Sequence, residues 1–162
     1  MQKIALIPPE KRVYLDESGI NEYLHRQHAR SVRGTKVFGE ISGKRFGRQS
    51  IISALQDKKF LAPMCFEGTC DTNLFNVWLK QELLPNLTPG QVLILDNASK
   101  SATTRKLVES YGCEIVFLPA YSPDLNPIEK YWANMKTKIR ELLPTSATLS
   151  QAFDSAILSM AI

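Results

Sequence analysis

The sequence predicts an α/β fold in which a mixed β-sheet carries helices on its faces. Short β-rich runs separated by turn residues fill the first half of the chain, and a strand–helix–strand unit occupies residues 91–118. Helical periodicity dominates the remainder. An antiparallel meander, a βαβ unit and closing helices, in that order, build a sheet that is covered by helices.

The first half of the chain contains four candidate strands. Each is a short run with several β-branched or aromatic residues. They are Arg12–Asp16, Lys36–Ile41, Gln49–Leu55 and Phe60–Phe66. The segment Ser42–Arg48 carries Gly43 and Gly47, as expected of a hairpin connection. We expect these strands to form the antiparallel meander.

Residues 91–118 read as a βαβ unit. Gln91–Asp96 is a continuous apolar run that ends in an acid, typical of a parallel strand buried on both faces. A helix over Ser101–Tyr111 is followed by Gly112, which suits the position just after a helix end. Cys113–Leu118 supplies the second apolar strand.

Two further helices flank this unit. Asp71–Leu84 places its apolar residues on one side, and either Asp71 or Thr72 is suited to cap its N-terminus. Thr148–Ile162 is predicted to form the terminal helix.

Another helix follows a loop that contains three prolines. Asn126 is predicted as its N-cap and Pro127 as its first residue. Glu129 falls in the first turn, either bonded back to the Asn126 amide as a capping-box variant or directed into a site built by other segments. The pattern leaves the place of Trp132 open. The apolar stripe of this helix comprises Ile128, Tyr131, Met135, Ile139 and Leu142.

Length and composition indicate one ordinary globular domain over residues 1–162. The apolar fraction is 44% and the charged fraction 22%. No apolar run approaches the roughly 20 residues of a membrane span, and the N-terminal run is too short for a secretory signal. We therefore expect an intracellular protein with no membrane partner.

The cysteines and histidines argue against a zinc site. Cys65, Cys70 and Cys113 form no C-x-x-C pair, and the two histidines, His25 and His28, lie far from them in sequence. We expect the thiols to be reduced and without a catalytic role.

A basic segment is the clearest candidate for contact with nucleic acid. The chain carries a net charge of +4, and residues 26–48 hold seven basic side chains against one acid, Glu40. Such a segment suits contact with DNA phosphates, although a solvated surface is the alternative. Lys136, two turns beyond Glu129, is a further candidate for DNA contact. The seven are Arg26, Arg30, Arg33, Lys36, Lys44, Arg45 and Arg48.

Two of the strongest predicted strands end in an aspartate, Asp16 and Asp96. Ligands of open α/β sheets lie at the carboxyl ends of strands, so both acids are placed for chemistry. Each also stands in a good turn sequence, which is the structural alternative. Together with Glu129, these aspartates could converge around divalent ions, because magnesium is held by a few carboxylates.

Three segments resemble the DDE transposases of the mariner-like superfamily, in their bacterial insertion-sequence branch. They read Y-L-D-E-S-G from Tyr14, I-L-D-N-A from Ile94 and Y-S-P-D-L-N-P-I-E from Tyr121. The resemblance runs from about Val13 to Leu143. It implies a ribonuclease H-like fold with a mixed five-stranded sheet and helices on both faces. It also implies a site of two magnesium or manganese ions held by the catalytic triad, which comprises Asp16, Asp96 and Glu129.

The resemblance implies an endonuclease and strand transferase that cuts transposon ends and joins them to target DNA. Double-stranded DNA, a homo-oligomer assembled on it and a location at the bacterial nucleoid follow from the same family. Two departures stand out. Ser101 replaces a histidine that relatives often carry, and no helix-turn-helix pattern precedes Arg12, so a separate chain is a candidate for end recognition.

Two alternatives remain open from the sequence. One is a non-catalytic DNA-binding or assembly module derived from a transposase. The other is a cellular ribonuclease H-like nuclease with a different DNA substrate.

Overall fold

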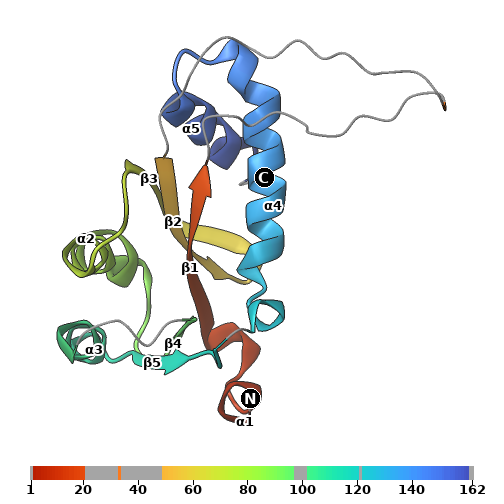
Figure 1. Cartoon of the computed structure of the whole chain (residues 1–162). Coiled ribbons are helices and arrows are strands. Elements are labelled where there is room, and N and C mark those ends of the chain that lie inside the picture. Colours follow the sequence, from red (N-terminus) through yellow and green to blue (C-terminus); the bar gives the residue numbers. More distant parts are fainter. Residues whose placement is uncertain (1, 21–32, 34–48, 97–101, 121, 161–162) are drawn as a thin grey trace.

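The computed structural model describes residues 2–20, 33, 49–96, 102–120 and 122–160. Within these ranges a five-stranded sheet has the order β3-β2-β1-β4-β5 (Figure 1). This confirms the predicted mixed sheet. The predicted strand Lys36–Ile41 and hairpin connection Ser42–Arg48 lie outside the described residues. The strands are β1 Arg12–Ile20, β2 Gln49–Gln56, β3 Lys59–Glu67, β4 Val92–Leu95 and β5 Glu114–Phe117.

Strand pairing divides the sheet into an antiparallel and a parallel half. β1 pairs antiparallel with β2, and β2 with β3, which is the predicted meander. β4 runs parallel to both of its neighbours, β1 and β5. β1 is therefore the central strand, and it is the strand where the two halves meet.

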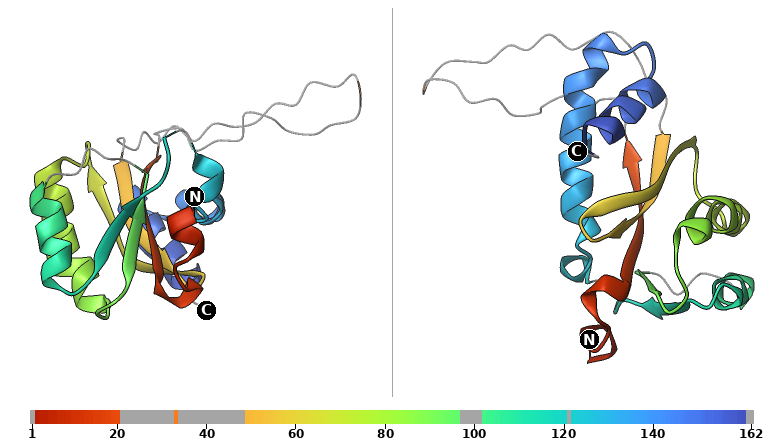
Figure 2. Two further views of the ribbon diagram at one scale, coloured as in Figure 1. Left: turned by 90° about the horizontal axis from the view of Figure 1, so that it is seen from below. Right: turned by 180° about the vertical axis from the view of Figure 1, so that it is seen from behind.

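Helices cover both faces of the sheet (Figures 1 and 2). On one face lie α2, which continues into a π-helical turn over Leu79–Leu83, and α3. On the other face lie α4 and α5, with the short α1 beside β4 and β5. None of the helices in the described ranges has the length and apolar character needed to cross a bilayer. The helices are α1 Gln2–Ala5, α2 Thr72–Trp78, α3 Ala102–Ser110, α4 Ile128–Leu142 and α5 Leu149–Met160.

Alternation along β1 separates two main cores. Val13 and Leu15 point to the α2/α3 face, where they join Trp78 and Val108. Tyr14 points to the opposite face and packs against the core that α4 and α5 cover. Even-numbered residues of this part of β1 therefore face α4, since successive strand side chains alternate.

Several predicted ends of elements are confirmed. The Asp71 carboxylate accepts a hydrogen bond of 2.7 Å from the Leu74 amide and caps α2. Gly112 follows α3 with φ +75°, and a Cβ there would lie 3.1 Å from the Pro89 Cβ. Glycine is needed at that position both for its backbone angle and for the close approach.

Two details of the predicted elements are wrong. Asn126 does not cap α4 with its side chain; Pro127 occupies the N-cap position, and the buried Asn126 Oδ1 has no hydrogen-bond partner among the described residues. β1 was expected to end at Asp16, but it continues to Ile20 and pairs with β2 over this extension. β5, the second apolar strand of the predicted βαβ unit, forms an edge of the sheet with Glu114 exposed. The apolar run alone could not distinguish an edge strand covered by helices from a central one.

Candidate functional site

The pairing of β1 with β4 brings Asp16, which lies within β1, level with Asp96, the first residue after β4. The last parallel pair is Tyr14 with Ile94; Asp16 lies two residues further along β1, and Asp96 lies two residues beyond Ile94, just past the end of β4. Because strand side chains alternate, Asp16 lies on the face of Tyr14, and Asp96 continues the side of Ile94. Both acids therefore belong to the sheet face that α4 covers.

Asp16 is tied to α4 by a side-chain hydrogen bond. The Trp132 indole Nε1–H donates to Asp16 Oδ2 at 3.0 Å. The pKa of Asp16 is raised to about 7, mainly because the carboxyl is buried. Hydrogen bonds from the Glu17 backbone and the Trp132 indole act in the opposite direction and lower this pKa. The negative charges of Glu129 and Asp96 also contribute to this raised pKa. The electrostatic effect of both acids on Asp16 puts the three predicted residues in one neighbourhood.

Glu129 is presented by the first turn of α4 and is exposed. Its backbone N–H donates to the Asn126 carbonyl at 3.2 Å, while the Asn126 N–H donates to the Pro123 carbonyl at 2.9 Å. The Asn126 amide is thus used by the 3₁₀ turn before α4, and the capping-box alternative for Glu129 does not hold. The Glu129 carboxylate is accordingly not used in capping α4.

Lys136 lies two turns further along α4 and is half-buried. The pKa of Lys136 is lowered, mainly because the side chain is partly buried. The negative charges of Glu129 and Asp16 act in the opposite direction, whereas the positive charge of Arg140 lowers this pKa as well. Its ammonium therefore lies within the electrostatic reach of two of the acids. A cation beside a group of carboxylates is suited to contact a bound phosphate.

The three carboxylates are of the right chemical type for a divalent metal, but in this structure they are not arranged as a metal site. Three carboxylates supply only oxygen ligands, which magnesium and manganese prefer. In the described part of the chain, no three His, Cys, Asp or Glu side chains stand close enough together to hold an ion. The raised pKa of Asp16, caused partly by the other two acids, is the electrostatic condition that a bound cation would relieve.

The described residues cover little of the predicted DNA contact. Among the basic candidates, Arg33 is exposed and Lys136 lies beside the acids. The other six basic candidates, both histidines and Ser101 lie outside the described residues.

Sequence reasoning missed the role of Trp132. Its side chain is 2% exposed, whereas Tyr131, which was expected in the core stripe, is only half-buried. The available signal was its position three residues after Glu129, which places both on neighbouring turns of one helix side.

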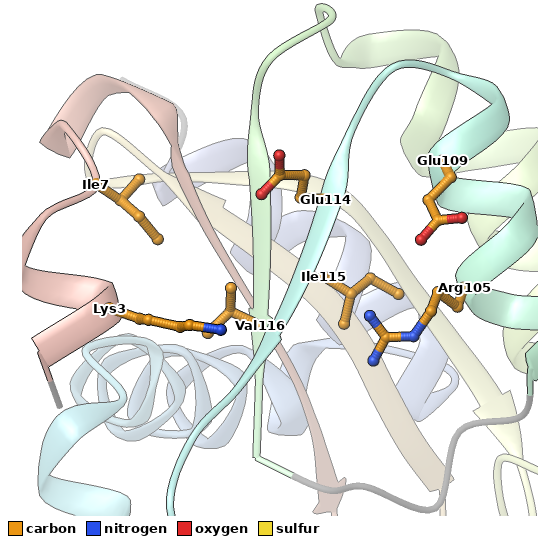
Figure 3. A pocket seen from close by; sticks show the side chains of 7 residues that line it. All are labelled: Lys3, Ile7, Arg105, Glu109, Glu114, Ile115 and Val116. Atoms are coloured by element: carbon orange, nitrogen blue, oxygen red, sulfur yellow. The ribbon is translucent and has the colours of Figure 1, made fainter.

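The described structure also contains a pocket of about 630 Å³, which is separate from the acids. It spans the edge strand β5 between α1 and α3 (Figure 3). Two basic and two acidic side chains surround an apolar floor, and none of the three predicted catalytic residues lines it. We assign the candidate site to the acids and not to this pocket. The lining residues are Lys3, Ile7, Arg105, Glu109, Glu114, Ile115 and Val116.

Comparison with solved structures identifies the fold. A chain of the Mos1 strand transfer complex matches with a TM-score of 0.61 at 15% identity, over 95% of this chain and 56% of that one. The catalytic core domain of BIV integrase matches with a TM-score of 0.62 at 12% identity, over 93% and 82% of the two chains. The Mos1 mariner paired end complex with Mn matches with a TM-score of 0.58 at 14% identity, over 99% and 58%.

These similarities confirm a ribonuclease H-like fold, that of transposase and integrase catalytic cores. The chain spans a little over half of the length of the Mos1 chains that it matches. No match was found among curated proteins. Residues 11–150 match the family described as DDE superfamily endonuclease, and the chain therefore belongs to that family.

Proposed function

We propose that this chain is a transposase catalytic domain that cuts DNA at transposon ends and joins the freed ends to target DNA. The observation that carries the proposal is that Asp96 and Glu129, which come from segments distant in the chain, both act electrostatically on the buried Asp16 carboxyl. Asp16 lies within β1, Asp96 directly follows the parallel strand β4, and Glu129 acts electrostatically on Asp16 from the start of α4. Membership of the DDE endonuclease family supports the same reaction class.

In this proposal the three carboxylates hold two magnesium or manganese ions. Bound divalent ions supply the charge that activates the attacking oxygen and stabilises the leaving oxygen of a phosphodiester. Asp16 is held against α4 by Trp132, Asp96 is exposed at the end of β4, and Glu129 is exposed in the first turn of α4. Exposure of the latter two leaves room for a DNA strand.

The residues also suit the two chemical steps. Hydrolysis breaks the bond between phosphorus and the 3′-oxygen at the transposon end and releases a 3′-hydroxyl. The oxygen of that hydroxyl then attacks a phosphorus of the target strand and forms a new phosphodiester, while the bond from that phosphorus to the target's 3′-oxygen breaks and the target 3′-hydroxyl leaves. Lys136 is placed to neutralise a phosphate beside the acids, and the basic segment 26–48 is proposed to bind the duplex further away.

The partners and setting follow from this reaction. Double-stranded DNA is the substrate, a homo-oligomer on DNA would bring two ends together, and a separate chain is a candidate for end recognition. We assign the protein to the bacterial insertion-sequence branch and to the nucleoid. The matched structures include a strand transfer complex and a paired end complex, which supports this assignment.

Metal binding tests the proposal before DNA cleavage does. We would titrate manganese into the protein by calorimetry, comparing wild type with Asp96→Asn, Glu129→Gln and the control Asp124→Asn. Asp124 is an exposed acid in the 3₁₀ turn before α4, so its substitution by asparagine removes the same charge as the other two substitutions that are compared. Weaker binding in the first two variants, with the control unchanged, is the expected result; equal affinity in all four proteins would overturn the triad.

One observation favours a second candidate, a non-catalytic DNA-binding or assembly module. Within the described residues, no group of three His, Cys, Asp or Glu side chains is arranged to hold an ion. In that case the protein would retard DNA in a salt-dependent manner but bind no manganese. The same titration therefore separates the two candidates.

A further inference from the structure

We propose that Trp132 is a positioning residue, which holds the Asp16 carboxylate in one orientation for metal binding. The proposal deepens the function proposed above and rests on it. Trp132 would not contact the metal itself, and its effect on metal binding would act through Asp16.

The hydrogen bond has the right chemistry for this role. Trp132 Nε1 lies 3.0 Å from Asp16 Oδ2 and joins residues that are 116 positions apart in the chain. An indole N–H is only a donor, so it cannot compete with the carboxylate as a metal ligand. A bond from a neutral donor to an ionised acceptor is stronger than one between neutral groups. One carboxylate oxygen is thus anchored while its remaining lone pairs stay available.

The indole itself is fixed by its surroundings. Trp132 is 2% exposed, and the ring of Phe60 on β3 lies with its centroid 5.2 Å away at an interplanar angle of 34°. Burial on all sides leaves the ring one orientation, which sets the direction of its N–H. The packing between α4 and the sheet therefore determines the direction of the Trp132 N–H.

The other tryptophan shows what a purely structural indole does in this fold. Trp78 is equally buried, at 1% exposed, but it lies on the α2/α3 face and donates to the backbone carbonyl of Ala62 at 2.8 Å. That carbonyl belongs to a bulge in β3, where the register with β2 shifts. Trp132 differs because its acceptor is a functional carboxylate.

The helix also couples two of the acids. Glu129 and Trp132 lie one turn apart on α4, so the same rigid element presents one carboxylate and orients another. Any displacement of α4 along the sheet would move both at once. The geometry needed for metal binding is in this way set by the packing of one helix on β1.

The wild-type protein provides a direct test, because it contains only two tryptophans. Its two indole N–H signals would be followed by nitrogen-15 NMR during titration with magnesium and then with manganese. We expect magnesium to shift the Trp132 signal and paramagnetic manganese to broaden it, with the Trp78 signal much less affected. A Trp132 signal that behaves like that of Trp78 under saturating metal would overturn the proposal.

A pair of variants gives the second measurement. Trp132→Phe keeps an aromatic ring but removes the donor, and we expect it to weaken manganese binding by about tenfold in calorimetry. Trp78→Phe is the matched control and should bind as wild type does. Equal affinity for folded Trp132→Phe and wild type would overturn the positioning role while leaving the proposed function intact. If wild type binds no manganese, the proposed function fails and this role fails with it. If Trp132→Phe does not fold, the wild-type spectra decide.

Discussion

At the scale of single residues, the Asp16 carboxyl combines burial with the negative potential of two other acids. Both effects favour its neutral form, and the hydrogen bond from Trp132 opposes them. A functional group held in this way is expected to reduce the stability of the metal-free fold. The next two predictions concern the residues of this site.

Replacing Asp16 should stabilise the metal-free protein at neutral and alkaline pH. The pKa of Asp16 is about 7 in the fold, against an ordinary value of 3.8 for an aspartate. The folded state therefore binds more protons than the unfolded state between these values, so the stability contributed by Asp16 is full below pH 3.8 and is lost as pH rises through 7. We expect Asp16→Asn to gain on the order of 1–3 kcal/mol over wild type above pH 8, as measured by urea unfolding with a chelator present.

The gain should shrink as the pH is lowered toward 4. Asp124→Asn is the control, because it removes the same charge at an exposed turn and Asp124 does not contribute to the raised pKa of Asp16. A difference between Asp16→Asn and wild type that stays constant from acid to alkaline pH would contradict the assignment of the raised pKa.

Lys136 should contribute one phosphate contact to DNA binding. Lys136→Gln is expected to weaken duplex binding and to reduce the slope of log affinity against log salt by about 1. Fluorescence anisotropy over a range of salt concentrations would measure both. Lys138→Gln is the control on the same helix, since Lys138 is 3.3 Å from Glu141 and pairs with it. A Lys138→Gln variant with the same loss would show that only general charge matters.

At the scale of elements, strands were the most predictable part of the chain. β1, β2, β3 and β4 follow from short β-rich or apolar runs bounded by turn residues, and the resemblance correctly implied their mixed sheet. The burial of Trp132 was not predictable, because it depends on how widely the sheet covers α4. Apolar periodicity alone placed Tyr131 in the stripe instead.

The start of α4 shows a second limit of sequence reasoning. A cap is chosen by the path of the preceding loop as well as by residue type. Here the 3₁₀ turn Pro123–Leu125 already uses the Asn126 amide. The sequence therefore predicted where α4 begins to within two residues, but not how its first turn is bonded.

The cap of α2 provides a prediction for an element. Asp71→Ala removes the 2.7 Å hydrogen bond to the Leu74 amide and should lower the free energy of unfolding by about 1 kcal/mol. Asp71→Asn keeps a side-chain oxygen at the cap and should lose far less. Chemical denaturation of both variants would test this, and equal losses would show that charge rather than capping is responsible.

At the scale of the whole molecule, the candidate site exists only in the folded chain. Its acids come from β1, from the end of β4 and from the start of α4, which are brought together by the central position of β1. The sequence supplied the identity of these acids through family resemblance. The sequence could not show that the two aspartates share a sheet face, because that depends on the register between β1 and β4. It also could not show how the three acids are spaced, because that depends on the folded structure.

Metal binding should therefore stabilise the entire fold. A ligand that binds only the folded state adds about 2.7 kcal/mol at a hundred times its dissociation constant. Manganese is expected to raise the unfolding midpoint of wild type by this mechanism, and the increase should be absent in Asp96→Asn. Thermal unfolding with and without manganese would measure it. Equal increases in the two proteins would mean that the ion binds elsewhere.

The matched positions of Asp16 and Asp96 on parallel strands have a consequence for changes in chain length. Loops between the strands can grow or shrink without moving either acid, because the hydrogen-bond ladder sets their alignment. One residue inserted between Arg12 and Leu15 would instead turn Asp16 toward the α2/α3 face. Two inserted residues would restore the face but displace the carboxylate by about 6.6 Å along the strand. In this fold, length variation is compatible with the site in the connections and incompatible with it inside β1.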